Sequence, residues 1–486
     1  MKVKSQIDAL LLSLWRNRNI SLFFIYVCYN TFNKRKWLVV NDTIVAISTA
    51  LGEGAISIIR VSGDDAIKIV NPLFDGKDLE KALSHTINYG HIVYDDEIID
   101  EVLLSIMKAP KTYTKEDVIE INTHGSIAVV NKIMEILLLL GCRLAEPGEF
   151  TKRAFLNGRI DLTESEGVMD LINSETELTR RMAINELSGN VSKLIVELRD
   201  KIVGLISNIE VNIDYPEYED IEVVTINKIK SEVGQMKDEL SKILKLSYDG
   251  KILKGGIKTV ILGKPNVGKS SLLNALLEEE KAIVTDVKGT TRDIVEGSII
   301  VGGVKLNLID TAGVRKSNDT VEKIGIEKSL SLIDEAELVL LVLDASEELS
   351  EEDKFLLDKT KDKKRIIIMN KEDLKNVNDY NGKYIKVSAK NNEGIDDIKD
   401  KIKDLFNVGT FLNKNLTYFT NARQIALVKS AIKSLDDVIA GVEEEREIDM
   451  IEIDLKLVWE KLGDIIGANY TEELVDNLFS RFCLGK

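Results

Sequence analysis

The octapeptide at residues 263–270, Gly-Lys-Pro-Asn-Val-Gly-Lys-Ser, limits the fold of this chain more than any other segment. It has the G-x-x-x-x-G-K-[ST] spacing of a loop whose backbone N–H groups surround the phosphates of a nucleotide. A short apolar run at 258–262 precedes it and a good helix-forming stretch at 271–279 follows it, which is the strand–loop–helix context that the motif needs. We therefore expect an α/β domain in which Lys269 reaches the outer phosphates and Ser270 binds magnesium.

The base is expected to be read about a hundred residues further on. The apolar, strand-like run 365–369 ends in Asn-Lys-Glu-Asp at residues 370–373. An aspartate accepts two hydrogen bonds from guanine, whereas adenine would leave that acceptor unpaired, and unpaired buried acceptors discriminate strongly. A second short strand at 384–387 leads into Ser-Ala-Lys at 388–390, whose backbone is expected to close over the base. The pattern predicts a GTP site rather than an ATP site.

The segment between these motifs has the features of a nucleotide switch. Two strand-like runs, 298–301 and 304–309, are joined by a Gly-Gly pair that is typical of a hairpin. The second run leads into Asp-Thr-Ala-Gly at 310–313, whose aspartate is expected to reach magnesium through water. Thr290 and Thr291 supply the threonine that completes the magnesium shell in a switch loop ordered by the γ-phosphate.

Val314 follows directly, where Ras-like GTPases carry the glutamine that orients the attacking water. Valine has no polar atom for this task, so GTP hydrolysis is either slow or depends on another group. Glu322, at the start of the polar stretch 319–327, is one candidate. An ordinary exposed glutamate at a helix start is the alternative, and spacing alone leaves both interpretations open.

The transition state of GTP hydrolysis also requires positive charge near the phosphates, and Arg292 and Arg315 are available for it. The other candidate is a monovalent cation held by Asn266 and by backbone carbonyls of the loop 285–290. Oxygen-only ligation of this kind suits a hard cation.

The length of 486 residues accommodates about three domains. Residues 41–160 mix strand-like and helical runs, which is an α+β pattern, and helical periodicity dominates 161–252 and returns in 410–486. We expect one helical domain made of these two parts, with the GTPase domain inserted between them at 253–409. Separate folding of the C-terminal part is the alternative.

Composition excludes several other classes of protein. The three cysteines, Cys28, Cys142 and Cys483, form neither a disulfide framework nor a metal-ligand spacing, which fits a reducing cytosol. No apolar run approaches 18 residues, so we predict no membrane span. The net charge of −16 is unsuited to extensive contact with RNA phosphates.

Residues 1–40 contain seven Lys or Arg and one Asp. A basic, acid-poor start is either an organelle transit peptide or a segment translated from an upstream start and partly disordered. The second interpretation is favoured, so the expected location is cytoplasmic, and it is mitochondrial only if residues 1–40 are a transit peptide.

From about Asn41 to its end, the chain resembles the MnmE (TrmE) family of tRNA-modification GTPases. The segments that carry the resemblance are Asn41–Ala46, Pro147–Leu162, Gly289–Asp293, Val321-Glu322 before Ile324–Ile326, and Phe482–Lys486. A terminal Cys-Leu-Gly-Lys combined with an internal GTPase domain is very specific. The resemblance implies an α+β N-terminal domain for tetrahydrofolate binding and dimerisation, an all-α helical domain, and an inserted Ras-like P-loop GTPase domain.

For the GTPase domain, the resemblance implies hydrolysis without an external activating protein, with the two GTPase domains of a homodimer face to face. It makes Glu322 the residue that orients water and gives catalytic roles to Asn266 and Lys269. Magnesium is assigned to Ser270 and Thr291, and potassium to Asn266, Thr285, Val287 and Thr290. The residues expected to contact GTP are Asn266, Val267, Gly268, Lys269, Ser270, Ser271, Thr285, Asp286, Val287, Lys288, Gly289, Thr290, Thr291, Asp310, Thr311, Ala312, Gly313, Asn370, Lys371, Asp373, Ser388, Ala389 and Lys390.

The resemblance further implies a site for 5-formyl- or methylene-tetrahydrofolate. The residues that match it are Arg60, Glu120, Arg159 and Lys486. The chemistry is suitable, because folate carboxylates pair with Arg or Lys and the donor edge of a pterin pairs with a carboxylate such as Glu120. Cys483 is either a catalytic thiol near the folate or a small buried apolar residue.

Family members work with an FAD-dependent MnmG-type partner, so we expect a heterotetramer that attaches an aminomethyl or carboxymethylaminomethyl group to carbon 5 of the wobble uridine, position 34, of tRNA. Because the chain is acidic, the partner is expected to provide most of the contact with tRNA. The alternative is an RNA-binding switch of the ribosome-assembly type without transfer chemistry. A basic appendage with a G-x-x-G loop would favour that alternative, and the sequence has none.

Overall fold

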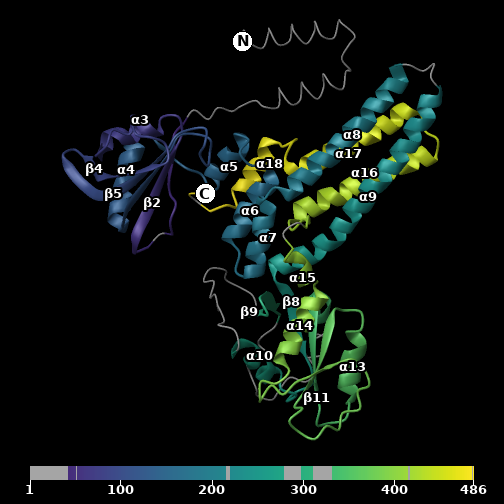
Figure 1. Ribbon diagram of the computed structural model, residues 1–486. Coiled ribbons are helices and arrows are strands. Elements are labelled where there is room, and N and C mark those ends of the chain that lie inside the picture. The colour runs from purple at the N-terminus through teal and green to yellow at the C-terminus, as the bar shows by residue number, and fades with distance from the viewer. Residues whose placement is uncertain are drawn as a thin grey trace. The chain divides into compact units, whose positions relative to one another are not determined.

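The computed structural model describes residues 42–50, 52–214, 219–278, 297–309, 331–413, 416–483 and 485. These residues form two compact units (Figure 1). The first unit is formed by the described residues of Met1–Met169, Ile195–Gln235 and Lys433–Lys486, and the second by those of Asp170–Leu194 and Met236–Ile432.

The first unit contains a mixed sheet that is antiparallel except at one edge. Among the described residues, its seven strands have the order β3-β4-β5-β6-β2-β1-β7, and only β1 and β7 pair in parallel. The bounds are β1 Ile44–Ile47, β2 Gly54–Ser62, β3 Phe74–Asp75, β4 Thr86–Tyr94, β5 Glu97–Met107, β6 Val118–Gly125 and β7 Arg143–Leu144.

One face of this sheet is covered by helices α3 (Ala66–Val70) and α4 (Ile127–Leu139), and a short 3-10 helix, η1 (Asn71–Leu73), follows α3. In α4, Val130, Ile133 and Leu137 follow the spacing of one helix face and are buried in the same core as the strands. The strands alternate buried and exposed residues, so the opposite face is open at β4 and β5, whereas Phe150 packs against it at β1.

The C-terminal end of the chain packs against a helix from the N-terminal part of the first unit. Helix α5 (Glu149–Leu156) contributes Phe155 to an apolar cluster with Phe479 of α18 (Glu472–Phe479) and with Phe482. The rings of Phe479 and Phe482 lie 4.9 Å apart. Gly485, three residues after Phe482, lies next to the N-terminal sheet, with its carbonyl oxygen bonded to Arg60 of β2.

Long helices make up most of the rest of both units. Their bounds are α6 Leu162–Ile172, α7 Glu177–Leu187, α8 Asn190–Asp214, α9 Glu219–Gly255, α16 Ala422–Glu443 and α17 Ile448–Ile466. The helical periodicity predicted for this region is confirmed along α8, where Val191, Ile195, Leu198, Ile202, Leu205, Ile206 and Ile209 are buried. In the first unit, Arg199 of α8 stacks on the Trp459 ring of α17 at 3.9 Å, and Lys230 of α9 pairs with Glu443 of α16 at 3.3 Å.

The second unit contains a mostly parallel sheet in an α/β arrangement. Its described strands have the order β13-β12-β11-β8-β10-β9, with only β9 antiparallel. Their bounds are β8 Ile257–Leu262, β9 Gly297–Val301, β10 Val304–Leu308, β11 Leu338–Asp344, β12 Arg365–Asn370 and β13 Ile385–Lys386. The strands predicted from sequence are confirmed within one or two residues at each end.

Helices cover both faces of this sheet. Their bounds are α10 Lys269–Glu278, α13 Glu351–Lys359, α14 Ile395–Leu405 and α15 Val408–Phe411. Every residue of β11 is buried, because its side chains alternate between a core with α10 and α14 and a core with α13. Helix α10 begins at Lys269, two residues earlier than predicted.

The helices predicted to form one separate domain are divided between the two units, because α8, α9 and α16 each contribute residues to both. The physical reason is visible in the second unit. Leu178 and Met182 of α7 and Leu253 of α9 are buried in the same apolar core as the parallel sheet. The domain boundaries at 160, 252 and 409 thus remain a prediction. Within the described ranges, no helix is both long and apolar enough to cross a bilayer.

Candidate functional site

The loop between β8 and α10 has the backbone that a phosphate loop requires. Gly263 and Gly268 adopt φ values of 148° and 95°. A Cβ at Gly263 would lie 2.3 Å from the Val342 carbonyl oxygen, and one at Gly268 would lie 2.3 Å from the Asn370 side-chain nitrogen. Both positions therefore require glycine for conformation and for space. Asn266 is also in the left-handed region, with φ 64°.

Lys269 is held across this loop by two backbone carbonyls. Its Nζ donates to the Gly263 oxygen at 2.6 Å and to the Lys264 oxygen at 2.8 Å. Burial lowers the pKa of Lys269, which means that its positive charge is incompletely compensated. An anion at the loop would restore the balance, and the start of α10 adds its own positive potential. The loop therefore fits the phosphates of a nucleotide, with Ser270 in the first turn of the helix for magnesium.

Asn370 connects the phosphate loop with the segment expected to close over the base. It lies at the end of β12, and its Nδ2 donates to the Val267 oxygen at 2.8 Å. Its Oδ1 accepts from the Ala389 backbone N–H at 3.1 Å. Sequence reasoning placed Asn370 among the residues that contact GTP. The structure gives it a bracing role between two loops that belong to one site.

Asp373, the aspartate predicted to read the base, is also held in place. Ser388 Oγ donates to Asp373 Oδ1 at 2.8 Å, while Lys390 is exposed. This hydrogen bond orients the carboxylate and leaves its other oxygen for the ligand. The predicted cluster of 370–373 with 388–390 is thus brought together at the carboxyl ends of β12 and β13, where open α/β sheets bind ligands.

One charged pair beside this site was not predicted. Lys371, with φ 66°, pairs with Asp344 at the end of β11 at 2.6 Å. Burial raises the pKa of Asp344, but hydrogen bonds from Lys371 and Ser346 outweigh burial and hold the pKa below its usual value. The pairing follows from the register, which places Asp344 opposite Asn370, and sequence alone does not give that register.

The remaining predicted residues of the GTPase site lie outside the described residues. They are Thr285, Asp286, Val287, Lys288, Gly289, Thr290, Thr291, Asp310, Thr311, Ala312, Gly313 and Glu322, together with Arg292, Val314 and Arg315. Their assignments stay predictions.

In the first unit, two of the predicted folate residues lie side by side on the open face of the sheet. Arg60 of β2 is directly opposite Glu120 of β6. Its Nε and Nη2 both contact Glu120 Oε1, at 2.9 and 2.7 Å. Within the described part of the chain, Glu120 Oε2 has no hydrogen-bond partner, so one acceptor of this carboxylate is available to a ligand.

Gly485, in the C-terminal tail that follows Phe482, lies beside the Arg60–Glu120 pair. The Gly485 carbonyl oxygen accepts from Arg60 Nη1 and from Ser48 Oγ, both at 3.2 Å. A Cβ at Gly485 would lie 2.3 Å from the Ile47 oxygen, so the tail lies directly against β1. Lys486 lies outside the described residues. The preceding residue, Gly485, is hydrogen-bonded through its carbonyl oxygen to the Arg60 side chain.

Cys483 is exposed, so the interpretation of this residue as small, buried and apolar is wrong. Its carbonyl oxygen accepts from the Gly148 backbone N–H at 3.2 Å, which ties the tail to the start of α5. Cys142 differs, because it is buried and burial raises its pKa to about 11. A buried thiol with such a pKa is unreactive, whereas an exposed one is open to substrate.

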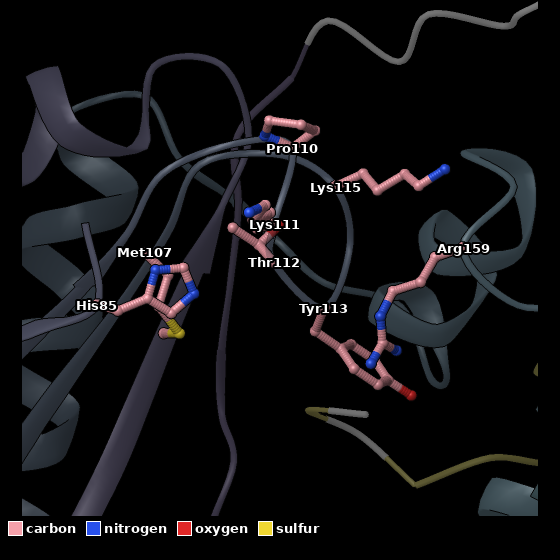
Figure 2. A pocket seen from close by; sticks show the side chains of 8 residues that line it. All are labelled: His85, Met107, Pro110, Lys111, Thr112, Tyr113, Lys115 and Arg159. Carbon is pink, nitrogen blue, oxygen red and sulfur yellow. The ribbon is translucent and has the colours of Figure 1, made fainter.

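Arg159 lies near the other two folate candidates through helix α5. Arg60 lies 5.5 Å from the ring of Phe150, and the adjacent Thr151 hydrogen-bonds to Tyr113 at 3.0 Å. Tyr113 in turn carries the Arg159 guanidinium over its ring at 4.7 Å. Figure 2 shows this stack at one side of a pocket of about 390 Å³.

Two further lysines line this pocket, Lys111 and Lys115, and sequence reasoning missed them. The signal in the sequence was weak, because the two basic residues stand in a loop with no motif of their own.

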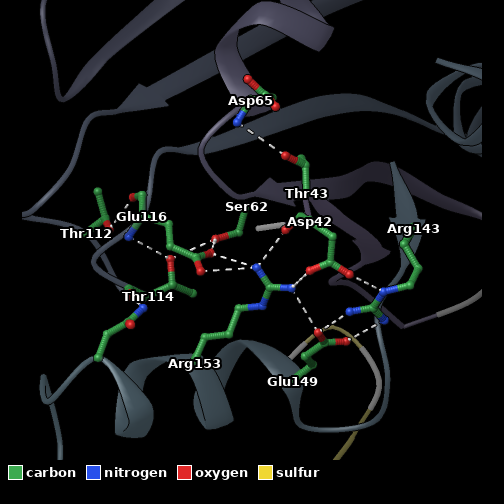
Figure 3. A network of polar contacts seen from close by, with 11 residues as sticks. Asp42, Thr43, Ser62, Asp65, Thr112, Thr114, Glu116, Arg143, Glu149 and Arg153 are labelled. Atoms are coloured by element: carbon green, nitrogen blue, oxygen red, sulfur yellow. Dashed lines mark hydrogen bonds and ion pairs between the residues drawn. The ribbon is translucent and has the colours of Figure 1, made fainter. Parts of the chain in front are cut away.

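The segment Pro147–Leu162, which carried part of the resemblance, has a structural role as well. Arg153 of α5 is almost fully buried and contacts three carboxylates, those of Asp42, Glu116 and Glu149 (Figure 3). Arg143 adds a second cation to Asp42 and Glu149. This ion cluster fixes α5 against the first strand.

The two buried carboxylates of the ion cluster differ in their pKa values. Burial raises the pKa of Glu149, but hydrogen bonds from Arg143, Arg153 and the Glu146 backbone outweigh it, so the net pKa is low. For Glu116, burial dominates over the charge of Arg153 and the pKa is raised. Both carboxylates are occupied within the cluster and are not free to bind a ligand.

Comparison with known proteins gives the family. Two family models match, "GTP-binding protein TrmE N-terminus" over residues 43–159 and "MnmE helical domain" over residues 162–483. The tRNA modification GTPase MnmE of Streptococcus thermophilus (strain CNRZ 1066) is 52% identical over 450 residues, which cover 92% of this chain and 98% of that protein. The chain belongs to the MnmE family of tRNA modification GTPases.

Other MnmE proteins are similar to the same extent. That of Ligilactobacillus salivarius (strain UCC118) is 51% identical over 455 residues, covering 92% of this chain and 98% of its own. Among solved structures, the G domain of T. maritima FeoB is 28% identical, covers 31% of this chain and 98% of its own, and has a TM-score of 0.22. The fold class expected of an MnmE protein is confirmed: an α+β N-terminal domain, a helical domain and a P-loop GTPase domain.

Proposed function

We propose that the chain is a potassium-activated GTPase that acts with an FAD-dependent, MnmG-type partner on tRNA in the cytoplasm. Together they would modify carbon 5 of the uridine at position 34, adding an aminomethyl or carboxymethylaminomethyl group. The observation that carries this proposal is the hydrogen bond from Arg60 to the Gly485 carbonyl. It joins the family's characteristic C-terminal tail to the Arg60–Glu120 pair.

The residues around this junction fit a reduced folate. Glu120 Oε2 would accept from the donor edge of the pterin, and Arg60 would orient the carboxylate. Arg159, and Lys486 beyond the described residues, would pair with folate carboxylates. A bound 5-formyl- or methylene-tetrahydrofolate would supply the one-carbon unit. Cys483 is exposed beside the tail and is proposed as a catalytic thiol.

In the GTPase domain, Lys269 would neutralise the outer phosphates and Ser270 would bind magnesium. Asn266 would hold potassium through its side-chain oxygen, with Thr285, Val287 and Thr290 as further ligands. Thr291 would complete the magnesium shell, and Glu322 would orient the attacking water. What supports this part is the form of the phosphate loop and the incompletely compensated charge of Lys269.

We further propose a homodimer that forms through the open face of the N-terminal sheet. Ile87 and Tyr89 of β4 and Leu103 of β5 are 68%, 64% and 48% exposed, and Tyr89 is directly opposite Leu103. The register places these side chains on the same face as Glu120, since Ser105 pairs with both Ile87 and Glu120. A contiguous apolar surface of this kind favours a protein interface, and a second copy would cover it and enclose the folate site.

The potassium role is tested by GTP turnover in potassium and in sodium. We expect turnover to be at least about tenfold faster in potassium, and Asn266→Ala to lose that difference, because a cation beside the phosphates replaces an arginine finger. Equal rates in both salts would refute potassium activation.

The folate role is tested by calorimetric titration of 5-formyltetrahydrofolate into the wild type and into Glu120→Gln. The glutamine keeps the size but replaces an acceptor with a donor, so affinity should fall on the order of tenfold or more. Glu80→Gln, on the exposed loop before β4, is the matched control and should bind like the wild type. Equal affinity of all three proteins would contradict the assignment of Glu120.

A further inference from the structure

The pocket beside Arg159 has a chemistry that the proposed function leaves unexplained. Lys111, Lys115 and Arg159 line it together with Tyr113 and His85 (Figure 2). We propose that this pocket binds the glutamyl tail of a folate with several γ-linked glutamates, so that polyglutamylated folate is the ligand of this protein. The inference rests on the proposed folate site and extends it.

Two of the cations, Lys115 and Arg159, are held in place by contacts at neighbouring backbone positions. Lys115 Nζ donates to the Gly158 carbonyl oxygen at 3.0 Å, which holds the ammonium beside the backbone that bears Arg159. The Arg159 guanidinium stacks on Tyr113 at 4.7 Å. Stacking occupies the face of the guanidinium and leaves its N–H edge available, and within the described residues no acceptor bonds to that edge.

The positive charges of the pocket are not neutralised by its own lining, which includes no carboxylate. The two acidic residues that follow Lys115, Glu116 and Asp117, form hydrogen bonds with other residues and do not pair with the cations of the pocket. Glu116 bonds to Arg153 at 3.1 Å and to Ser62 at 2.7 Å, and Asp117 accepts from the Ala109 backbone N–H at 2.8 Å. In a chain with a net charge of −16, three cations in a pocket that no carboxylate lines favour an anionic ligand, and Glu164, the acid in electrostatic contact with Arg159, accepts a hydrogen bond from the Asp161 backbone.

Two of the lining residues have a backbone conformation that side chains rarely adopt. Lys115 has φ 60° and His85 has φ 61°. Histidine adopts this region more readily than most residues, whereas for Lys115 the conformation is unfavourable in itself. Unfavourable backbone conformations gather where binding sites are built, and here both side chains face one pocket.

The form of the pocket favours a thin, flexible polyanion. Each γ-glutamyl unit adds one carboxylate, so a chain of three or more offers separate partners to three cations. The volume of about 390 Å³ lies in the range of small-molecule sites and is too confined for an RNA helix. Arg159 belongs both to the proposed folate site and to this pocket, so a tail that leaves the folate site beside Arg159 would enter the pocket.

The test compares dissociation constants of 5-formyltetrahydrofolate with one, three and five glutamates, measured by calorimetry on the full-length chain. Exposed ion pairs contribute modestly, so we expect five glutamates to bind roughly tenfold more tightly than one. The gain should shrink as the salt concentration rises. In the double variant Lys111→Ser/Lys115→Gly the gain should fall below about twofold.

This variant is suited to the test because glycine tolerates φ 60°, so Lys115→Gly also relieves the backbone. Lys132→Ser, an exposed lysine on α4, is the matched control and should keep the full gain. Free penta-γ-glutamate is the second probe, and it should compete with the long-chain folate but not with the monoglutamate.

The outcomes separate the two proposals. Equal affinity for all chain lengths overturns the tail pocket and leaves the folate site standing. Failure of every folate to bind overturns both. Competition by an anticodon stem-loop RNA, without competition by penta-γ-glutamate, would assign the lysines to RNA and overturn the inference.

Discussion

Asp373 accepts a hydrogen bond from Ser388 Oγ at 2.8 Å, and we propose that its carboxylate accepts the two donors of guanine. Asp373→Asn would replace one acceptor by a donor. Two charge-assisted hydrogen bonds would be lost, so affinity for GTP should fall on the order of 100-fold. Xanthine carries an oxygen where guanine has its amino group, so XTP should bind the variant better than GTP does. Competition between the two nucleotides for a fluorescent guanine analogue measures this.

The control for Asp373→Asn is Asp379→Asn, which changes a carboxylate on a neighbouring loop of the same unit. It should keep the preference for GTP. If Asp373→Asn still prefers GTP, the aspartate does not read the base.

Arg153 is the central residue of the ion cluster, with its side chain only 4% exposed. Arg153→Leu would leave Asp42, Glu116 and Glu149 without their shared cation. Breaking a buried pair from one side costs about 3–5 kcal/mol, so the midpoint of urea unfolding of the first unit should fall clearly. Circular dichroism against urea concentration gives the change.

Arg143 contacts two of the same carboxylates but is 41% exposed. Arg143→Leu should therefore cost no more than about 1 kcal/mol. Equal losses for both variants would contradict the view that burial decides the value of these contacts.

At the scale of helices, α7 and α16 meet in the second unit through a buried acid. Glu186 accepts from Gln424 at 2.7 Å and from Thr420 at 3.2 Å. Burial and the neighbouring Asp170 raise the pKa of Glu186 to about 8. The folded state thus keeps a proton that the unfolded state releases near 4.5, and the stability of the second unit should decrease as pH rises from about 4.5 through about 8.

Glu186→Gln should remove this pH dependence, because glutamine keeps an acceptor without a charge. The variant should be more stable than the wild type at pH 9, by on the order of 2 kcal/mol, and the difference should vanish toward pH 5. Thermal unfolding at several pH values measures it. Glu197→Gln, an exposed position on α8, should follow the wild type throughout. A wild-type stability that rises between pH 6 and pH 9 relative to Glu186→Gln would contradict the sign.

Periodicity was sufficient to predict the elements that bury one regular face or a continuous apolar run. Helix α8 and the strands β8 and β12 are of this kind. The contacts between elements were harder to foresee. The pair of Lys371 with Asp344 and the stack of Arg159 on Tyr113 depend on register and on tertiary packing, which no local pattern contains.

At the scale of the whole molecule, the exposed apolar face of the N-terminal sheet predicts that two copies of the chain associate. Tyr89→Arg would put a charge in the proposed interface. The dissociation constant Kd of the homodimer should therefore rise about tenfold or more. Sedimentation equilibrium at several concentrations measures this. Leu139→Arg introduces the same charge at an exposed leucine on α4, away from the open face, and should leave the dimer intact. A wild-type chain that stays monomeric at high concentration would rule the interface out.

Motifs predicted the ligand class and the family because the phosphate loop, the Asn-Lys-x-Asp segment and the terminal Cys-Leu-Gly-Lys each impose a definite chemistry. The boundaries of the predicted domains stay a prediction. Apolar positions in α7 and α9 gave no indication that their partner would be the parallel sheet of the GTPase domain, since a buried leucine does not specify what covers it.

The shared core of the second unit sets a condition for anyone who wishes to isolate the GTPase domain. A fragment cut at 253 and 409 would omit Leu178, Met182, Phe411 and Tyr418, all of which are buried in that core. Its exposed apolar surface would make the fragment prone to aggregate. The rate of GTP turnover measured with such a fragment would therefore differ from that of the full chain. A longer fragment that begins before α7 and ends after Tyr418 would keep these side chains and should remain soluble.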